Sequence, residues 1–219
     1  GRGGGGAAGR GGSPAGGVRA LRGRLVACAL ALAATAAMAE DPASEAELHF
    51  LAEPPQQAVH HHSNRITIDQ RALETGWTRL EQCHANMDAL GATQIVFREG
   101  RIRAIEVLST SNIDRARVEG PTVQLDGVRL KAETRNLEQA GETTFVLRNG
   151  PFMRRLFDSY FPLHVTLTVH FPPEAVTFRA MEPSPQPGLE LQQETGKVSI
   201  EAWFSGVLRT RLRFQATGP

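Results

Sequence analysis

The sequence predicts a mainly β fold, an antiparallel β-sandwich or a partly open barrel of roughly nine or ten strands with one short helix. Three observations lead to this prediction. Apolar and polar residues alternate with a period of two over much of the chain after residue 94. Turn residues recur about every ten residues. Finally, the alternation leaves one face of each segment apolar and the other polar, which is typical of antiparallel sheets with one buried face.

Four segments show the alternation most clearly, and we expect a strand in each. Their inward rows are Val128, Leu130, Ala132 and Thr134 in 122–135; Leu163, Val165, Leu167, Val169 and Phe171 in 163–171; Val198, Ile200, Ala202 and Phe204 in 198–204; and Leu208, Thr210, Leu212 and Phe214 in 206–214. The segment 77–90 fits two interpretations. Its large apolar residues recur at helical spacing, but the surrounding β pattern favours a strand, which is our prediction.

Turn signals separate these segments. Glu99-Gly100 and Asp126-Gly127 each lie between two apolar runs and are expected to close tight hairpins, because glycine accepts a positive φ. Thr195-Gly196 and Ser205-Gly206 mark further reversals. The three prolines of 183–188 predict a loop within one domain, because proline cannot donate to a strand ladder.

The short helix is predicted at 151–161. Pro151 suits a first helical turn, and Asn149 could cap it. Phe152, Leu156 and Tyr160 recur every four residues, and Pro162 would end the helix.

The first 39 residues differ in composition from the rest of the chain. All 23 acidic residues follow residue 39, and half of the 22 glycines precede residue 24. Residues 1–17 are expected to be a disordered leader, which a start at Val18 would leave untranslated. Residues 18–39 join a basic stretch, an uncharged run and a small-x-small ending. This is the layout of a signal peptide cleaved between Ala39 and Glu40.

The signal peptide predicts a periplasmic or secreted protein. We expect an extended segment over 40–64, a single β domain over 65–219, and no membrane-spanning segment after cleavage. Leu25 to Cys28 resembles a bacterial lipobox, but three apolar residues after Arg24 are too few, so we expect no lipid anchor at Cys28. The remaining Cys83 is then a free thiol without an intramolecular partner.

The net charge of the chain and its lack of catalytic motifs limit the classes of function that are consistent with the sequence. Residues 40–219 carry 19 basic and 23 acidic side chains. A net negative domain of this kind is a poor candidate for nucleic-acid binding. The chain contains no recognised nucleophile, metalloprotease or phosphate-binding motif. A non-enzymatic role is therefore the more consistent prediction.

Two sets of residues are candidates for binding. Arg209, Arg211 and Arg213 form a row on one face of a predicted strand, and Trp203 lies on the polar face of another. These residues lead to our first hypothesis, a periplasmic β domain that binds a protein or another component of the bacterial envelope.

The alternative hypothesis is a periplasmic protein that binds a transition metal, Cu or Zn. In an extended chain His60 and His62 point the same way about 6.6 Å apart, and His84 or Asp69 could supply a third ligand. The histidines follow a proline- and glutamine-rich stretch, so the sequence alone favours solvated surface histidines over a metal site.

Overall fold

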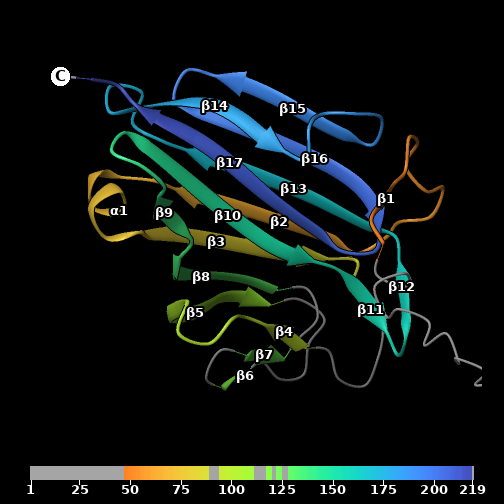
Figure 1. Cartoon of the computed structure of the whole chain (residues 1–219). Helices are drawn as coiled ribbons and strands as arrows, with labels where there is room; N and C mark the ends of the chain where they lie inside the picture. The colour runs from red at the N-terminus through yellow and green to blue at the C-terminus, as the bar shows by residue number, and fades with distance from the viewer. Residues whose placement is uncertain (1–46, 89–93, 111–116, 120–121, 125–127, 219) are drawn as a thin grey trace, which may run out of the picture. The chain divides into compact units, whose positions relative to one another are not determined.

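The computed structural model describes residues 47–88, 94–110, 117–119, 122–124 and 128–218 (Figure 1). The predicted leader, signal peptide and cleavage position lie outside these residues, and so does the turn expected at Asp126-Gly127. The described chain is mainly β with one helix, so the prediction of a mainly β, antiparallel fold is confirmed. None of the described helical structure has the length and apolar character needed to cross a membrane.

The larger of two main sheets has the strand order β1-β16-β13-β2-β3-β8-β5, with β15 also paired to β16. β13 and β2 run parallel, whereas the other described pairs in this sheet are antiparallel. Its strands are β1 (His49–Phe50), β2 (His61–Thr67), β3 (Trp77–Ala85), β5 (Ile102–Thr110), β8 (Val128–Arg135), β13 (Leu163–His170), β15 (Leu189–Glu194) and β16 (Lys197–Ser205). The predicted domain boundary between residues 64 and 65 falls inside β2.

The second main sheet is antiparallel, with the order β14-β17-β10-β9. Its strands are β14 (Val176–Glu182), β17 (Leu208–Ala216), β10 (Thr144–Phe152) and β9 (Leu137–Gln139). Two smaller sheets join β4 (Gln94–Val96), β7 (Thr122–Gln124) and β6 (Arg117–Glu119), and β11 (Arg154–Leu156) with β12 (Ser159–Phe161). There are more strands than predicted, because strands of two or three residues are too short to show an alternation.

The two main sheets share one hydrophobic core. Side chains from both sheets belong to a single cluster of buried residues, and the largest members are almost completely buried. Phe204 of β16 and Phe214 of β17 are 0% and 1% exposed. The inward rows predicted for 163–171, 198–204 and 206–214 are the rows that the structure buries. A separate small cluster around Ile95 and Leu130 lies under β5.

The strand predicted for 77–90 is confirmed over 77–85 as β3, whose inward row contains Thr78, Leu80, Gln82 and His84, while residues 89 and 90 lie outside the described residues. Thr195-Gly196 closes the β15–β16 hairpin as expected. The hairpin expected at Glu99-Gly100 is wrong in its pairing, because β4 pairs with β7 and β5 pairs with β8. The turn itself is present, with Gly100 at φ 70°.

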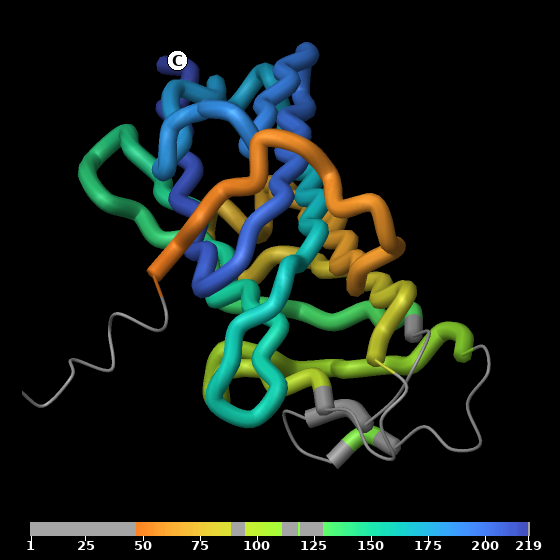
Figure 2. Tube along the Cα trace, turned by 90° about the vertical axis from the view of Figure 1, so that its right-hand side faces the viewer, coloured from red at the N-terminus to blue at the C-terminus, as the bar shows by residue number. Residues whose placement is uncertain are grey.

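The helix predicted over 151–161 is also wrong. β10 continues to Phe152 across an irregularity in its register with β17, and β11 and β12 then form a hairpin whose strands run side by side (Figures 1 and 2). Phe152 is buried in the core, while Phe157 at the hairpin turn is 96% exposed. The fourfold spacing of aromatic residues therefore reflects one core residue and a hairpin, not a helical face.

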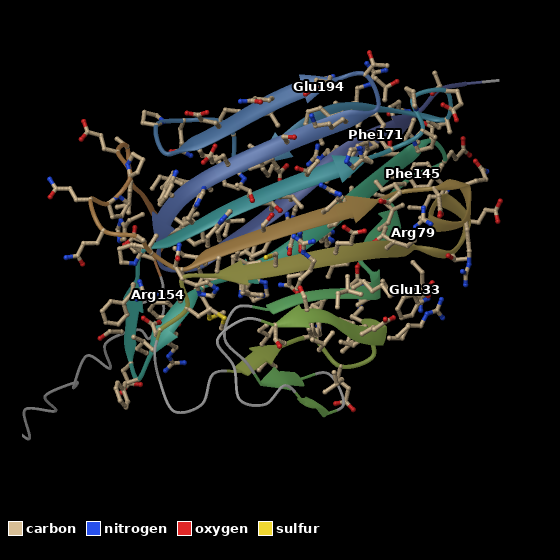
Figure 3. All side chains as sticks on the ribbon, turned by 180° about the vertical axis from the view of Figure 1, so that it is seen from behind. Arg79, Glu133, Phe145, Arg154, Phe171 and Glu194 are labelled. Carbon is tan, nitrogen blue, oxygen red and sulfur yellow. The ribbon has the colours of Figure 1, made fainter. Side chains whose placement is uncertain are left out.

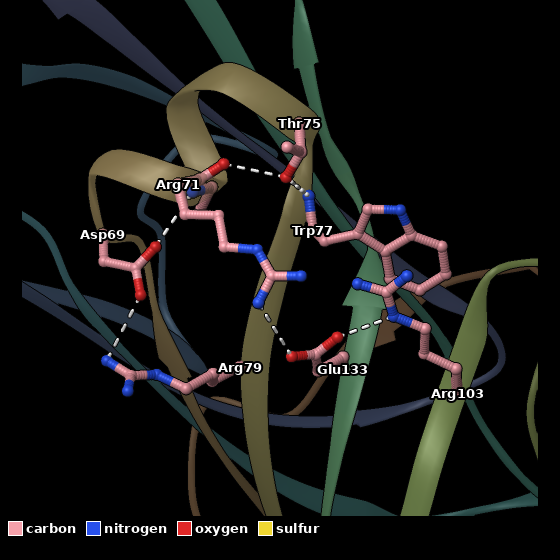
Figure 4. Close-up of polar contacts among 8 residues, drawn as sticks. Asp69, Arg71, Thr75, Trp77, Arg79, Arg103 and Glu133 are labelled. Atoms are coloured by element: carbon pink, nitrogen blue, oxygen red, sulfur yellow. Dashed lines mark hydrogen bonds and ion pairs between the residues drawn. The ribbon is translucent and has the colours of Figure 1, made fainter.

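The actual helix, α1 (Gln70–Thr75), connects β2 to β3. Asp69 caps it by accepting a hydrogen bond from the Ala72 backbone N–H at 2.9 Å, and Gly76 ends it at φ 76°. Charged side chains tie the helix to the sheet (Figure 4). Asp69 pairs with Arg79 of β3, and Glu133 of β8 pairs with Arg71 of the helix. Glu133 also accepts from Arg103, whose guanidinium lies 4.0 Å over the Trp77 ring.

Candidate functional site

Histidines gather where β2 begins. β2 lies between β13 and β3, and the registers place His61 beside His164 of β13 and His62 opposite His84 of β3. His60 immediately precedes the strand, and its carbonyl accepts from the His164 backbone N–H. Adjacent residues of a strand point to opposite faces, so this segment presents histidines to both faces of the sheet.

The inner face holds His60, His62 and His84, called here the histidine cluster. His60 Nε2 lies 2.9 Å from His84 Nδ1, a hydrogen bond between two imidazoles. The His62 and His84 ring centroids are 4.2 Å apart, and the rings of His60 and His62 are parallel at 6.5 Å. The edge of Phe152, from the second main sheet, contacts His62 at a centroid distance of 5.0 Å. The cluster therefore lies between the two sheets.

A polar row continues from the cluster along β2 and β3. His62 Nε2 lies 3.0 Å from Asn64 Oδ1 and also within hydrogen-bond distance of Gln82 Nε2. Asn64, Gln82 and His84 are each 4% exposed. One imidazole nitrogen can donate or accept a single hydrogen bond, so His62 cannot satisfy both amides at once. The buried row thus has more hydrogen-bonding capacity than its own members use.

Burial keeps the cluster uncharged. Desolvation, followed by the nearby Arg154 guanidinium, lowers the pKa of His60 to about 4. Desolvation and the charge of His60 lower the pKa of His62 to about 3. The pKa of His84 is well below its usual range for the same reasons, burial first and His62 second. At neutral pH each ring is therefore an uncharged imidazole, which is the form that binds metal ions.

An ion pair adjoins the cluster. Arg154, at the start of β11 (Figure 3), donates through Nε to Asp88 Oδ2 at 3.0 Å and through Nη2 to Asp88 Oδ1. Arg154 also donates to the Pro162 carbonyl at 3.2 Å. This hydrogen bonding lowers the pKa of Asp88 and raises the pKa of Arg154. The hairpin of β11 and β12 is thereby attached to the end of β3, next to His60.

On the outer face of the larger sheet, the rings of His61, His164 and Trp203 form a stack. The His61 and His164 rings lie 4.1 Å apart, and the His164 ring lies 3.8 Å from Trp203 of β16, nearly parallel in both pairs. His61 hydrogen-bonds to Thr166 Oγ1 and His164 to Glu201. Trp203 is on the face opposite the core, as its position in the alternation predicted. Its ring face is already covered by His164.

The residues predicted for partner binding lie on two different sheets. Arg209, Arg211 and Arg213 are exposed on the face of β17 opposite the core, whereas Trp203 belongs to the other main sheet. Glu182 of β14 pairs with Arg213 at 2.7 Å and with Arg211 at 3.5 Å. The structure therefore does not combine the arginine row and Trp203 into one surface. Cys83 is a free, partly buried thiol on the outer side of β3.

The residues predicted for metal binding are brought together. His60, His62 and His84 meet although 22 residues separate His62 from His84 in the chain. Asp69, the other third ligand considered, instead caps α1. Within the described ranges, no group of three or more His, Cys, Asp or Glu side chains is placed so that it could hold a metal ion.

Coordination of one ion by all three histidines would require their rings to move from these hydrogen-bonded positions. Two imidazole nitrogens bound to one tetrahedral zinc ion at 2.0–2.1 Å are separated by about 3.3 Å. The His60–His84 nitrogen distance of 2.9 Å is a few tenths of an ångström shorter. His62 would have to turn its ring from the two amides toward the same point.

Sequence reasoning missed most of the surrounding polar groups. Asn64 and Gln82 were not considered, and neither were Asp88 and Arg154. The usable signal was a polar residue at an inward position of an alternating strand, as at Gln82 between Leu80 and His84. Comparison with models of protein families and with curated proteins gives no match.

Proposed function

We propose that this chain is an exported β-sandwich domain of the bacterial envelope that binds a divalent transition-metal ion, Cu²⁺ or Zn²⁺, through His60, His62 and His84. The observation that carries the proposal is the hydrogen bond between His60 and His84, with the His62 ring 4.2 Å from that of His84. Imidazole suits both ions, and copper binds most tightly of the common divalent ions at a given site of nitrogen ligands.

Three properties of the cluster favour metal binding. The lowered pKa values mean that an ion does not compete with protons at neutral pH. Two ligands come from β2 and its preceding residue and one from the paired β3, so the sheet limits their motion. His60 is only partly buried, which leaves a path for the ion from solvent. Export is supported by the signal-like arrangement of residues 18–39.

The test is metal binding by the tag-free chain in a buffer without chelating groups. We expect about one equivalent of Cu²⁺ or Zn²⁺ by elemental analysis after gel filtration, with a matching isothermal titration. His84→Gln and His60→Gln should each reduce retention to below about a tenth of an equivalent, because two imidazoles hold these ions far less tightly.

His49→Gln is the matched control. His49 pairs with Glu47 at the surface, and its side chain is 62% exposed, so this variant should retain the ion fully. Circular dichroism would verify that every variant is folded. A folded native chain that retains no ion, or a His84→Gln variant that retains as much as the native chain, would end the proposal.

A second candidate function is the binding of another envelope protein through the arginine row. It is favoured by three exposed guanidiniums on one strand, of which Arg209 has no ion-pair partner in the described chain. Affinity capture from the host envelope with mild cross-linking tests it. The double variant Arg209→Glu and Arg211→Glu should lose a specific partner while remaining folded.

A further inference from the structure

The outer face of the second main sheet has an excess of positive charge. Four exposed arginines of β10 and β17 lie on it and are called here the arginine face: Arg148, Arg209, Arg211 and Arg213. Within the described chain, two carboxylates pair with them, Glu138 of β9 and Glu182 of β14. The face is therefore net positive, although residues 40–219 as a whole carry 19 basic and 23 acidic side chains.

The register of β10 with β17 places like charges together. Arg148 lies directly opposite Arg211, and like charges in this position destabilise an antiparallel pair. In the larger sheet, the described basic residues of β2, β3, β5 and β8 that face a charged residue across the strands face a carboxylate. These pairs are Arg65 with Glu81, Arg79 and Arg103 with Glu133, and Lys131 with Glu81 and Glu106. An arrangement that costs stability on one sheet, and that the other sheet avoids, indicates a surface for an external anion.

The guanidinium groups of the arginine face are open to such an anion. The side chains of Arg148, Arg211 and Arg213 are between 48% and 56% exposed although each has an ion-pair partner. A guanidinium has five N–H donors, so one contact with a carboxylate leaves most of them for a ligand. Paired donors of arginine suit phosphate and carboxylate groups, which they bind through two hydrogen bonds at once.

The hairpin of β11 and β12, which continues from β10 (Figure 1), adds exposed aromatic groups. Arg154 points from this hairpin to Asp88, which follows β3 of the larger sheet. Because side chains alternate along a strand, Arg155 and its cross-strand neighbour Tyr160 point away from the larger sheet, as the arginine face does. Phe157 at the turn is 96% exposed and has a φ of 54°, which is rare for a bulky residue. An apolar ring held in solvent at a conformational cost indicates a role in binding.

We propose that the arginine face docks on the surface of an anionic lipid bilayer and that Phe157 inserts between the lipid headgroups. A bilayer surface accommodates both kinds of group, because it attracts cationic side chains to its headgroups and buries aromatic rings at the acyl boundary. A protein interface instead gathers its aromatic residues into a central, desolvated patch, whereas Phe157 lies at the tip of a hairpin. The proposal is independent of the metal site. It uses the same arginine row as the second candidate function, and vesicle binding separates the two.

The experiment measures cosedimentation of the chain with vesicles of equal parts phosphatidylglycerol and phosphatidylcholine, and with vesicles of phosphatidylcholine alone. Residues 18–39 are themselves basic and apolar. Variants of the full chain are therefore compared with one another, and the series is repeated with residues 40–219, which contain both main sheets and their shared core. We expect reversible binding of residues 40–219 to the anionic vesicles only, and weaker binding at higher salt, because salt screens exposed charges.

Two sets of variants test the contacts. Each arginine near an anionic surface contributes about fivefold to binding, so Arg209→Gln with Arg213→Gln should bind about 25-fold more weakly. Phe157→Ser should bind about tenfold more weakly, because it removes an inserted aromatic ring. The matched control is Arg65→Gln with Arg79→Gln, which removes the same charge from side chains 62% and 65% exposed on the larger sheet. This control should bind like the native chain, and circular dichroism would verify that every variant is folded.

Three results would overturn the docking surface. The first is no cosedimentation of residues 40–219 with the anionic vesicles. The second is equal binding by the two double arginine variants, because net charge rather than the arginine face would then explain the effect. The third is binding to soluble polyglutamate but not to vesicles, which would assign the arginine face to an acidic protein. Unchanged binding by Phe157→Ser would overturn the insertion of the hairpin.

Discussion

Acidification from pH 6.5 to pH 5 should strongly destabilise the metal-free domain. His60, His62 and His84 are uncharged in the folded state because of burial, and their pKa values lie well below the ordinary value of 6.5. In the unfolded chain each histidine regains that ordinary value and binds a proton. Since the unfolded state binds more protons, stability falls as the pH drops below 6.5 and continues to fall until the folded-state pKa values, about 4 for His60 and about 3 for His62, are reached.

The size of the effect follows from the shifts. Each histidine that stays neutral in the folded state costs about 1.4 kcal/mol per pH unit below 6.5. At pH 5 this amounts to about 2 kcal/mol for each residue, or about 6 kcal/mol for three that titrate independently. Residual exposure of His60 reduces the sum somewhat. A domain of this length is stable by about 5–15 kcal/mol, so the loss is comparable with its whole stability.

Urea unfolding at pH 7.5, 6.5, 5.5 and 5.0, followed by circular dichroism with chelator present, measures the effect. We expect the slope of the unfolding free energy below pH 6 to correspond to uptake of two to three protons. Carboxylates contribute little in this window, because Asp88 and Glu138 have pKa values lowered by their arginine partners and titrate at lower pH. A slope of one proton or less would refute the reasoning. In His84→Gln the slope should fall by about one proton, and in His49→Gln it should not change.

Other predictions concern the fold itself, each checked by urea unfolding at pH 7.5. Asp69→Ala removes the α1 cap and should cost about 1 kcal/mol; no change would mean that another group takes over the cap. Gly76→Ala should cost more than Asp69→Ala, because φ is 76° and the new Cβ would lie 2.6 Å from the Leu137 carbonyl oxygen. Leu212→Ala, at a fully buried position, should cost about 3 kcal/mol, and a cost below 1 would contradict the shared core. Phe157→Ser, at a residue 96% exposed, should change stability by less than about 0.5 kcal/mol.

The sequence predicts strands well where one face is apolar and the other is polar. The segments 163–171, 198–204 and 206–214 have this pattern because each has one face in the shared core. The pattern gives a wrong prediction where buried and exposed aromatic residues lie within a few positions of each other. Phe152 is a core residue and Phe157 an exposed turn residue, so their spacing resembles a helical face without being one.

The local sequence pattern does not predict which side chains of the candidate site meet in the folded protein. The sequence suggests His60, His62 and His84 as possible ligands, but their meeting depends on the register of β2 with β3. That register follows from contacts along the whole pair, since a slip of one residue would move every side chain to the other face. Phe152 comes from the second sheet, so its contact with His62 depends on how two sheets share a core. No spacing along the chain encodes that.

The inward positions of Asn64 and Gln82, on β2 and β3, hold polar side chains at a cost in folding free energy. Further along the same two strands, Ile66 and Leu80 occupy equivalent positions and are buried without polar atoms. An apolar row could therefore continue through the positions of Asn64 and Gln82. Each unpartnered buried polar atom instead costs about 1–3 kcal/mol. A ligand at 1,000 times its dissociation constant stabilises the folded state by about 4 kcal/mol, which offsets the cost of two or three such atoms. An ion bound at the histidine cluster should therefore raise the unfolding free energy of the domain by an amount comparable with the cost of these unpartnered atoms.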